Sequence, residues 1–344
     1  MKRVKLKQGT LSWEKARSMR IGSSEIFDIV RYYATDDELQ YCGFNAEAFR
    51  SEKPYTTAWA LYHKMQNDGF YKKEALAPEF AEYGHAVEPY GVYKLQKGRQ
   101  KRLRPGVVYA NERLIASLDI EGTAEEVDIV PFDYGRGTPK IGQRFVCEQK
   151  SMLPNMVKNG LPFKYIVQAQ YQITKTKADF YILQLMVLKI DDTPFNRGKI
   201  CQMSRKAKYK FLDENMTVTH YYFKNNEHLA RLIEKCIQLF FEDVDAHREP
   251  RPFIEFDSAK NIIESIRLNA LYNDTPFDLD LDAYKKAKDE EDAAVQKRKA
   301  LLQGIVDTAK EYNVCRFRSG DGTTAQFAKD GSFRMRIPVE VKCG

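Results

Sequence analysis

The sequence predicts an α/β protein of the α+β type, in which a central mixed sheet is flanked by helices. Apolar runs of strand length alternate with amphipathic stretches of helix length over the first 255 residues. The segment 178–188 is almost continuously apolar, as expected of a strand buried on both faces. A charged helix followed by two short strands is predicted from residue 284 onward. We therefore divide the chain into a core, residues 1–255, and a C-terminal helix-plus-hairpin appendage, residues 256–344.

The composition indicates a globular protein with a polyanionic partner. The chain has 344 residues, of which 43% are apolar, and 55 Lys and Arg against 48 Asp and Glu give a net charge of +7. It contains no long apolar run and no N-terminal signal pattern, so we expect no membrane segment and a cytoplasmic location. The 6 cysteines and 5 histidines are dispersed, which argues against a disulfide framework, a zinc site or an iron–sulfur cluster.

The N-terminal region combines basic residues with a glycine-containing turn. A helix is predicted to begin at Trp13, with Ser12 as its N-cap, and residues 21–26 read as a turn into a second helix. Two arginines precede two hydroxyl residues here: Arg17, Arg20, Ser23 and Ser24. Hydroxyls, backbone N–H groups and a helix N-terminus together suit an anion. Taken alone, however, the two serines are better explained as helix caps.

A helix is predicted over residues 78–95, followed by a densely basic stretch. Glu82, His85 and Glu88 lie on a related face of this helix, which by itself indicates only a solvated acidic surface. The basic residues that follow are Lys94, Lys97, Arg99, Lys101, Arg102 and Arg104. Such a stretch suits either a solvated loop or contacts with a nucleic-acid backbone, for which we select Lys97, Arg99, Lys101 and Arg102.

The candidate catalytic residues lie on predicted strands. Residues 107–110 and 114–119 form a predicted hairpin that places Asp119 at the end of an apolar strand, and a further strand is expected at 125–131. The next strand ends in Glu148-Gln149-Lys150. Because alternate side chains of a strand share a face, Glu148 and Lys150 project together.

A polar helix is predicted after this strand, at residues 162–174. Tyr165 and Gln168 face the same way on it. An Asp on one strand and a Glu-x-Lys on another suit metal-dependent phosphodiester hydrolysis. The carboxylates bind Mg²⁺, and the lysine positions or activates a water while offsetting the developing charge.

Four short blocks resemble the PD-(D/E)XK nucleases, and within them the phage-type recombination exonucleases of the lambda exonuclease/YqaJ group. The blocks are Trp13-x-x-x-Arg17 with Ile21-Gly22-Ser23-Ser24-Glu25, Gly84-x-x-x-Glu88, Ala116-Ser117-x-Asp119, and Glu148-x-Lys150 followed by Tyr165-x-x-Gln168. They occur in the family's order over about residues 10–190. The fold implied is a core like that of restriction endonucleases.

The resemblance also implies a role for each candidate residue. The metal ligands would be Asp119, Glu148 and the backbone carbonyl of Gln149, with Glu88 near the metal, Lys150 as the catalytic lysine and Gln168 supporting it or the substrate. The ion would be Mg²⁺, with Mn²⁺ as a substitute. The pocket for a DNA 5′-phosphate would comprise Arg17, Ser24 and Ser117, with Arg20 and Ser23 as neighbours, which reverses the simpler interpretation of the serines as caps.

The implied activity is a 5′-to-3′ exonuclease on linear double-stranded DNA ends. It would leave 3′ single-stranded overhangs for phage-type recombination, in the cytoplasm of a bacterial host if phage-encoded. A ring-shaped homo-oligomer, often a trimer, and a single-strand annealing protein are the implied partners. The alternatives are an endonuclease or RecB-like nuclease on the same fold, or a non-catalytic DNA-binding scaffold.

Two departures from the family pattern concern the first carboxylate. Gly122 does not directly follow Asp119, because two residues intervene. The interval from Asp119 to Glu148 is 29 positions, which we expect the strand at 125–131 to occupy. Asp128 is therefore the alternative ligand to Asp119.

Overall fold

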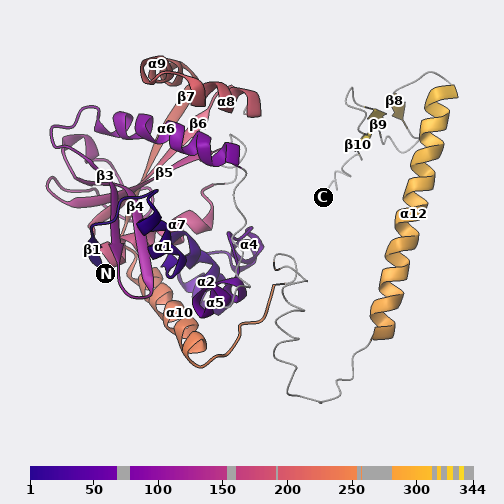
Figure 1. The fold of residues 1–344 in the computed structure, drawn as a ribbon, viewed down its shortest axis with the longest axis horizontal. Helices are drawn as coiled ribbons and strands as arrows, with labels where there is room; N and C mark the ends of the chain where they lie inside the picture. Colours follow the sequence, from indigo (N-terminus) through magenta and orange to yellow (C-terminus); the bar gives the residue numbers. More distant parts are fainter. Residues whose placement is uncertain are drawn as a thin grey trace, which may run out of the picture. The chain divides into compact units, whose positions relative to one another are not determined.

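The computed structural model describes residues 1–67, 78–152, 160–190, 193–253, 257, 281–311, 316–318, 324–327 and 333–336. The chain forms two compact units, Met1–Leu271 and Tyr272–Gly344. Figure 1 labels most of the helices and strands of both.

The first unit is built on one seven-stranded mixed sheet. Its strands follow the order β1 (Lys2–Val4), β3 (Arg104–Ala110), β4 (Leu114–Thr123), β5 (Arg144–Met152), β6 (Phe180–Leu188) and β7 (Met216–Lys224), and β2 (Ile21–Gly22) pairs with β4. The β2–β4 and β5–β6 pairs are parallel, and the other pairs are antiparallel. The predicted mixed sheet flanked by helices is confirmed.

Helices cover both faces of this sheet. On one face pack α2 (Ile26–Tyr33), α5 (Ala58–Gln66), α7 (Phe163–Thr176) and α10 (Glu227–Asp245). On the other face lie α6 (Pro78–Gln96), α8 (Pro194–Gln202) and α9 (Arg205–Asn215). Figure 1 shows α6 and α10 on opposite sides of the strands. The catalytic candidates on β4 and β5 therefore lie between two helical layers.

The predicted periodicities identify the core. The apolar residues that recur at helical spacing along one stripe of α10 are buried: Leu229, Leu232, Ile233, Cys236, Ile237 and Phe240. All but one residue of β6 are buried, as its continuous apolar run indicated. On α6, Gly91 lies so close to the Gln149 amide of β5 that an added methyl group would clash with it. This close approach holds α6 against the strand that carries the Glu-x-Lys pair.

Several local predictions were wrong. The side chain of Thr10, not Ser12, caps α1 (Leu11–Ser18), because the Trp13 amide donates to its hydroxyl. The strand expected at 125–131 is instead a single 3₁₀ turn, η2 (Glu126–Asp128). The segment between α2 and α5 contains the short helices α3 (Asp36–Tyr41) and α4 (Ala46–Ser51).

The second unit contains one long helix and a small sheet. The helix α12 (Leu281–Glu311) is followed by β8 (Arg316–Arg318), β9 (Thr324–Phe327) and β10 (Phe333–Arg336), which form an antiparallel sheet in sequence order. The predicted helix and two strands are present, and β9 adds a strand that was not predicted. None of the helices in the described part of the chain is long and apolar enough to cross a membrane.

Candidate active site

The sheet opens between β4 and β5 at the candidate carboxylates. The last residue pair joining these strands is Ile120 with Cys147. Beyond it β5 continues beside β6, and β4 beside β3, so Asp119 and Glu148 are the first residues past the last pair. We call this opening the fork. Asp119 is thus not the end of its strand, which runs on to Thr123.

The Asp119 carboxylate accepts a hydrogen bond from a backbone N–H of β5, just beyond the point where β4 and β5 stop pairing. The Gln149 backbone N–H donates to Asp119 Oδ2 at 2.7 Å. Burial raises the pKa of Asp119 well above its usual range, and the Glu148 carboxylate and, to a smaller extent, Glu88 raise it further. Lys150 and the Gln149 amide oppose this shift without cancelling it. The ionised form of Asp119 is therefore disfavoured by its surroundings in the protein alone.

Lys150 is held as a cation within the fork. Its ammonium lies 2.7 Å from Glu148 Oε1 and 5.6 Å from the centre of the Tyr165 ring. Burial alone would lower the pKa of Lys150, but Glu148 and, to a smaller extent, the acidic groups of Tyr55, Asp119 and Tyr165 outweigh burial and raise it. The predicted projection of Glu148 and Lys150 on one side of β5 therefore corresponds to a direct ion pair.

The remaining predicted residues lie at different depths around the fork. Glu88 is half-exposed at the edge of the fork, and its Oε1 lies 3.5 Å from His85 Nδ1. Gln168 is only 2% exposed, and its Oε1 has no hydrogen-bond partner. The side chain of Gln149 lies against Gln184 and α6, so any role of Gln149 as a ligand concerns its backbone carbonyl.

Two residues near the fork were not singled out from the sequence. Gln172 donates from Nε2 to Glu148 Oε2 at 3.1 Å and to Ser23 Oγ at 3.1 Å. It lies one helical turn after Gln168, so the helical period would have put both on one face. Tyr55, in the loop between α4 and α5, is 48% exposed as a residue, but its hydroxyl is desolvated: burial of this group raises its pKa, Lys150 opposes the shift, and Tyr165 and Glu148 add to it. Loop residues have no period, and the sequence gives no comparable signal for Tyr55.

The turn at residues 22–25, which we call the serine turn, is adjacent to the fork. The parallel pairing of Gly22 with Ile115 brings the turn alongside β4. Ser23 accepts a hydrogen bond from Gln172, and on β4 Ser117 Oγ accepts one from Trp13 Nε1 at 2.9 Å. Arg17 lies over the Trp13 ring, with its guanidinium carbon 5.2 Å from the ring centre.

A buried ion pair supports the serine turn. Glu25 Oε2 accepts the Gly22 N–H at 2.7 Å, and Lys64 Nζ lies 2.9 and 2.8 Å from the two Glu25 oxygens. Burial lowers the pKa of Lys64, and Arg17 lowers it further, whereas Glu25 raises it. Glu25 neutralises Lys64, so the positive charge that favours an anion beside this turn comes from Arg17.

Not every predicted phosphate-pocket residue faces this turn. Ser24 is half-buried within the turn itself. Arg20 instead donates to the backbone carbonyls of Asn111, at 2.7 Å, and Ala16, at 2.9 Å. These bonds hold the start of β2 to the β3–β4 connection, so we assign Arg20 a structural role.

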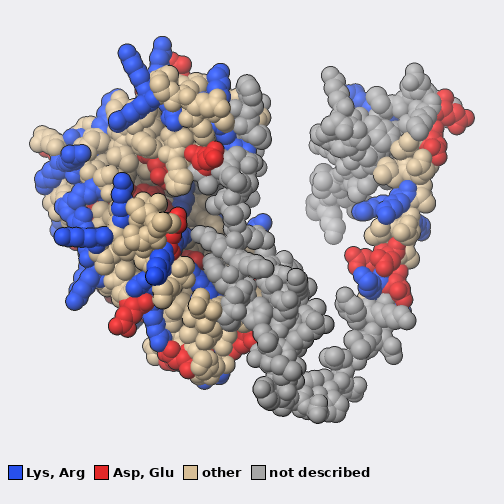
Figure 2. All heavy atoms as spheres, viewed as in Figure 1, with Lys and Arg blue, Asp and Glu red and all other residues tan. Residues whose placement is uncertain are grey.

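The basic stretch before β3 divides into one buried residue and several exposed ones. Arg99 makes a two-pronged ion pair with Asp128, and these side chains are 3% and 0% exposed. This geometry contradicts both the use of Arg99 on a DNA backbone and the choice of Asp128 as a metal ligand. Lys97, Lys101 and Arg102 are exposed. Figure 2 shows Lys and Arg side chains along this edge of the core and over α9.

The donor atoms of the fork fit a hard divalent cation. Among the described residues, no group of three or more His, Cys, Asp or Glu side chains has metal-binding geometry. Mg²⁺ commonly takes one or two protein carboxylates and keeps several waters, so Asp119 and Glu148 suffice. Burial raises the pKa of Asp119 most and the Glu148 carboxylate raises it further, and a bound cation would favour the ionised form against both effects. Oxygen donors also suit Mn²⁺.

Comparisons with known proteins give a distant likeness. No protein-family model and no curated protein matches the chain. An alkaline exonuclease from Laribacter hongkongensis is similar at a TM-score of 0.41 and 13% identity, over 75% of this chain and 100% of that one. A phage-related exonuclease from Haemophilus somnus 129PT is similar at 0.40 and 10%, over 66% and 94%. Because these values are low, the function proposed below rests on the geometry of the site.

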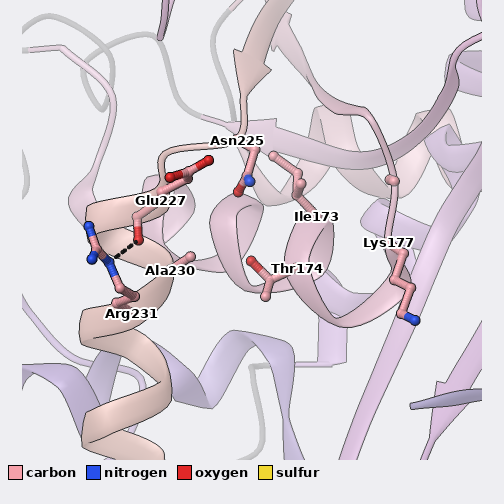
Figure 3. Close-up of a pocket in the computed structure, with 8 residues that line it drawn as sticks. Ile173, Thr174, Lys177, Asn225, Glu227, Ala230 and Arg231 are labelled. Carbon is pink, nitrogen blue, oxygen red and sulfur yellow. Dashed lines mark hydrogen bonds between the residues drawn. The ribbon is translucent and has the colours of Figure 1, made fainter.

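A hollow elsewhere on the first unit is unrelated to the fork. It has a volume of about 480 Å³ and is lined by residues from the end of α7 and the start of α10. Figure 3 shows Thr174, Asn225 and Arg231 at this hollow, with Arg231 bonded to the backbone of Glu227 in its own helix. None of the candidate catalytic residues lines it.

Proposed function

We propose that this protein is a Mg²⁺-dependent exonuclease that degrades the 5′-phosphorylated strand of linear double-stranded DNA. The observation that carries the proposal is the convergence of Asp119, Glu148 and Lys150 at the fork, with the serine turn joined to them through Gln172. The residues of the fork suit hydrolysis of a phosphodiester bond, and those of the serine turn suit binding of a terminal phosphate.

Asp119, Glu148 and the backbone carbonyl of Gln149 would hold Mg²⁺, for which Mn²⁺ substitutes, with Glu88 at the edge of the site. When bound, the ion polarises the scissile phosphate and lowers the pKa of a bound water. The raised pKa of Lys150 keeps its side chain an ammonium at neutral pH. In that form it orients a water and offsets negative charge on the phosphate, rather than removing a proton.

Gln168 is suited to a supporting role beside Lys150. Its buried Oε1 has no partner in the protein, and a buried acceptor without a partner is costly. A water or a substrate hydroxyl group would satisfy it. We therefore place Gln168 against the reacting water or the nucleotide, on the side of the fork formed by α7.

The serine turn would select the 5′-phosphate. Since an indole nitrogen can only donate, the bond from Trp13 occupies an acceptor position of Ser117 and leaves the serine's own hydrogen free to donate. Arg17 adds a positive charge above the Trp13 ring. Ser117, Ser23, Ser24 and Arg17 thus present donors and charge to an anion.

Further features of the proposal follow from 5′-end selection. Cleavage from that end leaves 3′ single-stranded overhangs, which suit recombination by strand annealing with an annealing protein as partner. Exposed Lys97, Lys101 and Arg102 would contact the duplex backbone. A ring-shaped homo-oligomer would keep the enzyme on its substrate.

The proposal is tested by digesting two linear DNA duplexes that differ only in carrying a 5′-phosphate or a 5′-hydroxyl group at their ends. Wild-type protein should release mononucleotides only with Mg²⁺ or Mn²⁺, and faster from a 5′-phosphorylated than from a 5′-hydroxyl end. Lys150→Met should lower the rate by about 10²–10⁴-fold, as expected for loss of a charge-stabilising catalytic group. Cutting of closed circular DNA would instead indicate an endonuclease. Metal-independent binding without cleavage would indicate a scaffold.

A further inference from the structure

We propose that Gln172 is a positioning residue that couples the terminal-phosphate pocket to the metal-binding carboxylate. The inference rests on the proposed function, which it extends by naming the group through which end recognition reaches the catalytic centre. It is carried by one buried amide whose nitrogen contacts a member of each site.

The orientation of this amide is fixed by its partners. Gln172 is 0% exposed on α7, and its Nε2 lies 3.1 Å from Glu148 Oε2. Lys150 Nζ donates to the other oxygen of Glu148, so this carboxylate is an acceptor at both oxygens and the amide presents its nitrogen to it. The two oxygens of Glu148 are thus held separately, one by Lys150 and the other by Gln172.

The second contact of Gln172 sets the direction of the Ser23 hydroxyl. Gln172 Nε2 also donates to Ser23 Oγ at 3.1 Å, so Ser23 is the acceptor and its own hydrogen must point elsewhere. Ser117 is held in the same way by Trp13. Both serines are thereby turned into donors for an anion, although the residues that orient them come from different helices.

The coupling arises because the two hydrogens of one NH₂ group serve both sites. Drawing the amide toward Ser23 lengthens its bond to Glu148, and the reverse is also true. A phosphate that accepts from Ser23 makes that oxygen a stronger acceptor, and it therefore alters how firmly Glu148 is held. The phosphate pocket and the carboxylate should accordingly influence each other's affinity to the same extent.

A packing role alone does not account for a glutamine at this position. The Gln172 Oε1 is buried and has no hydrogen-bond partner. A buried acceptor without a partner destabilises the fold, so an apolar side chain of similar size would serve packing better. The amide is retained at a cost in stability, which is expected where it acts on a functional site.

The experiment compares the wild type with Gln172→Met, which keeps the side-chain length and removes the amide. The first readout is the ratio of initial rates on 5′-phosphate and 5′-hydroxyl duplex ends. The second, independent of activity, is the Mn²⁺ concentration that gives half of the maximal increase in melting temperature. We expect Gln172→Met to lower the rate ratio and to raise the Mn²⁺ midpoint, each by about 10-fold, since residues that orient a metal ligand typically contribute 10- to 100-fold in affinity.

Gln170→Met is the matched control. Gln170 is a buried glutamine of the same helix, but its amide bonds to Thr174 and Asn225 and its oxygen accepts from Asn226, away from the fork. It should lower the melting temperature and leave the rate ratio and the Mn²⁺ midpoint within about 2-fold of the wild type, because it touches neither site. A change of both readouts in the control would show that any α7 defect produces them, and would overturn the inference.

The outcomes separate the two proposals. A folded Gln172→Met protein with both readouts unchanged overturns the coupling while leaving the nuclease proposal intact. Wild-type protein that cleaves neither substrate overturns the proposed function, and the Mn²⁺ midpoint then still decides whether Gln172 holds Glu148. Should Gln172→Met not fold, Gln172→Asn tests the same point, because its amide is one methylene too short to reach both partners. An Asn variant that matches the wild type would refute the coupling.

Discussion

Asp119→Asn is expected to stabilise the protein while removing its activity. Asparagine has nearly the shape of aspartate, and its side-chain oxygen can keep the hydrogen bond from the Gln149 backbone N–H. The substitution removes a carboxylate whose pKa is raised by burial and by Glu148. The variant keeps the geometry of the fork but has less electrostatic repulsion there, and residue 119 becomes a weaker metal ligand.

The sign of the pH dependence follows from the direction of the shift. An acid whose pKa is raised on folding favours the folded state while it is protonated, and this advantage is lost as the pH rises through the folded pKa. Wild-type stability should therefore fall with pH relative to Asp119→Asn. The two proteins should differ least below the ordinary carboxyl range, about pH 4, and most at about pH 8.

The expected magnitude is modest and measurable. Removing a strained active-site charge typically adds about 0.5–2 kcal/mol, which corresponds to roughly 1–8 °C in melting temperature for a domain of this size. For a dissociation constant of about 1 mM, roughly 10 mM Mg²⁺ should stabilise the wild type by about 1.4 kcal/mol. Asp119→Asn should lose most of that gain because it binds the ion more weakly.

Thermal unfolding of both proteins at about pH 5 and pH 8, with and without Mg²⁺, measures all of these quantities. The reasoning predicts a variant that is more stable at the higher pH and less responsive to Mg²⁺. A variant less stable than the wild type at the higher pH would refute the account of Asp119 as a carboxylate whose ionised form is disfavoured by burial and by Glu148. An equal Mg²⁺ response in both proteins would refute its role as a ligand.

Three further substitutions test other parts of the structure. Arg99→Met should cost about 3–5 kcal/mol, seen as a large fall in melting temperature, because it leaves Asp128 charged and buried; an unchanged melting temperature would contradict a buried pair. Trp13→Phe keeps a ring under Arg17 but removes the donor to Ser117, and should reduce the 5′-phosphate preference by about 2- to 10-fold; unaltered end preference would argue against the pocket. Tyr55→Ala should lower kcat/KM by about 5- to 150-fold, because this half-exposed side chain beside the fork is placed to stack on a base, whereas Tyr41→Ala, an exposed control, should not; equal effects would exclude stacking.

The sequence predicted those features that depend on local pattern. The alternation along β5 placed Glu148 and Lys150 on one side, and the ion pair between them agrees with it. The apolar run of β6 and the stripe of α10 located the core on the same grounds. The spacing of apolar residues along one helix or strand is visible in the sequence, so a buried face can be recognised without knowing which elements pack against it.

Features that depend on pairing between distant segments were missed. Arg99 sits in a basic stretch, and only the position of η2 shows that Asp128 pairs with it and buries it. The fork arises where β4 and β5 stop pairing, which is a matter of register between strands. Gln172 could be distinguished from Gln170 only once Ser23 and Glu148 were known to lie beside it. Tyr55 depends on how the loop after α4 is held.

The measurement that tests the central claim most directly is mononucleotide release from 5′-phosphorylated linear duplex by wild type, Glu148→Gln and Lys150→Met, each first shown to be folded. We predict release by the wild type only with Mg²⁺ or Mn²⁺, and losses of at least about 10²-fold in both variants. Comparable release by either folded variant, or release by the wild type with the metal chelated, would contradict the assignment of catalysis to the fork.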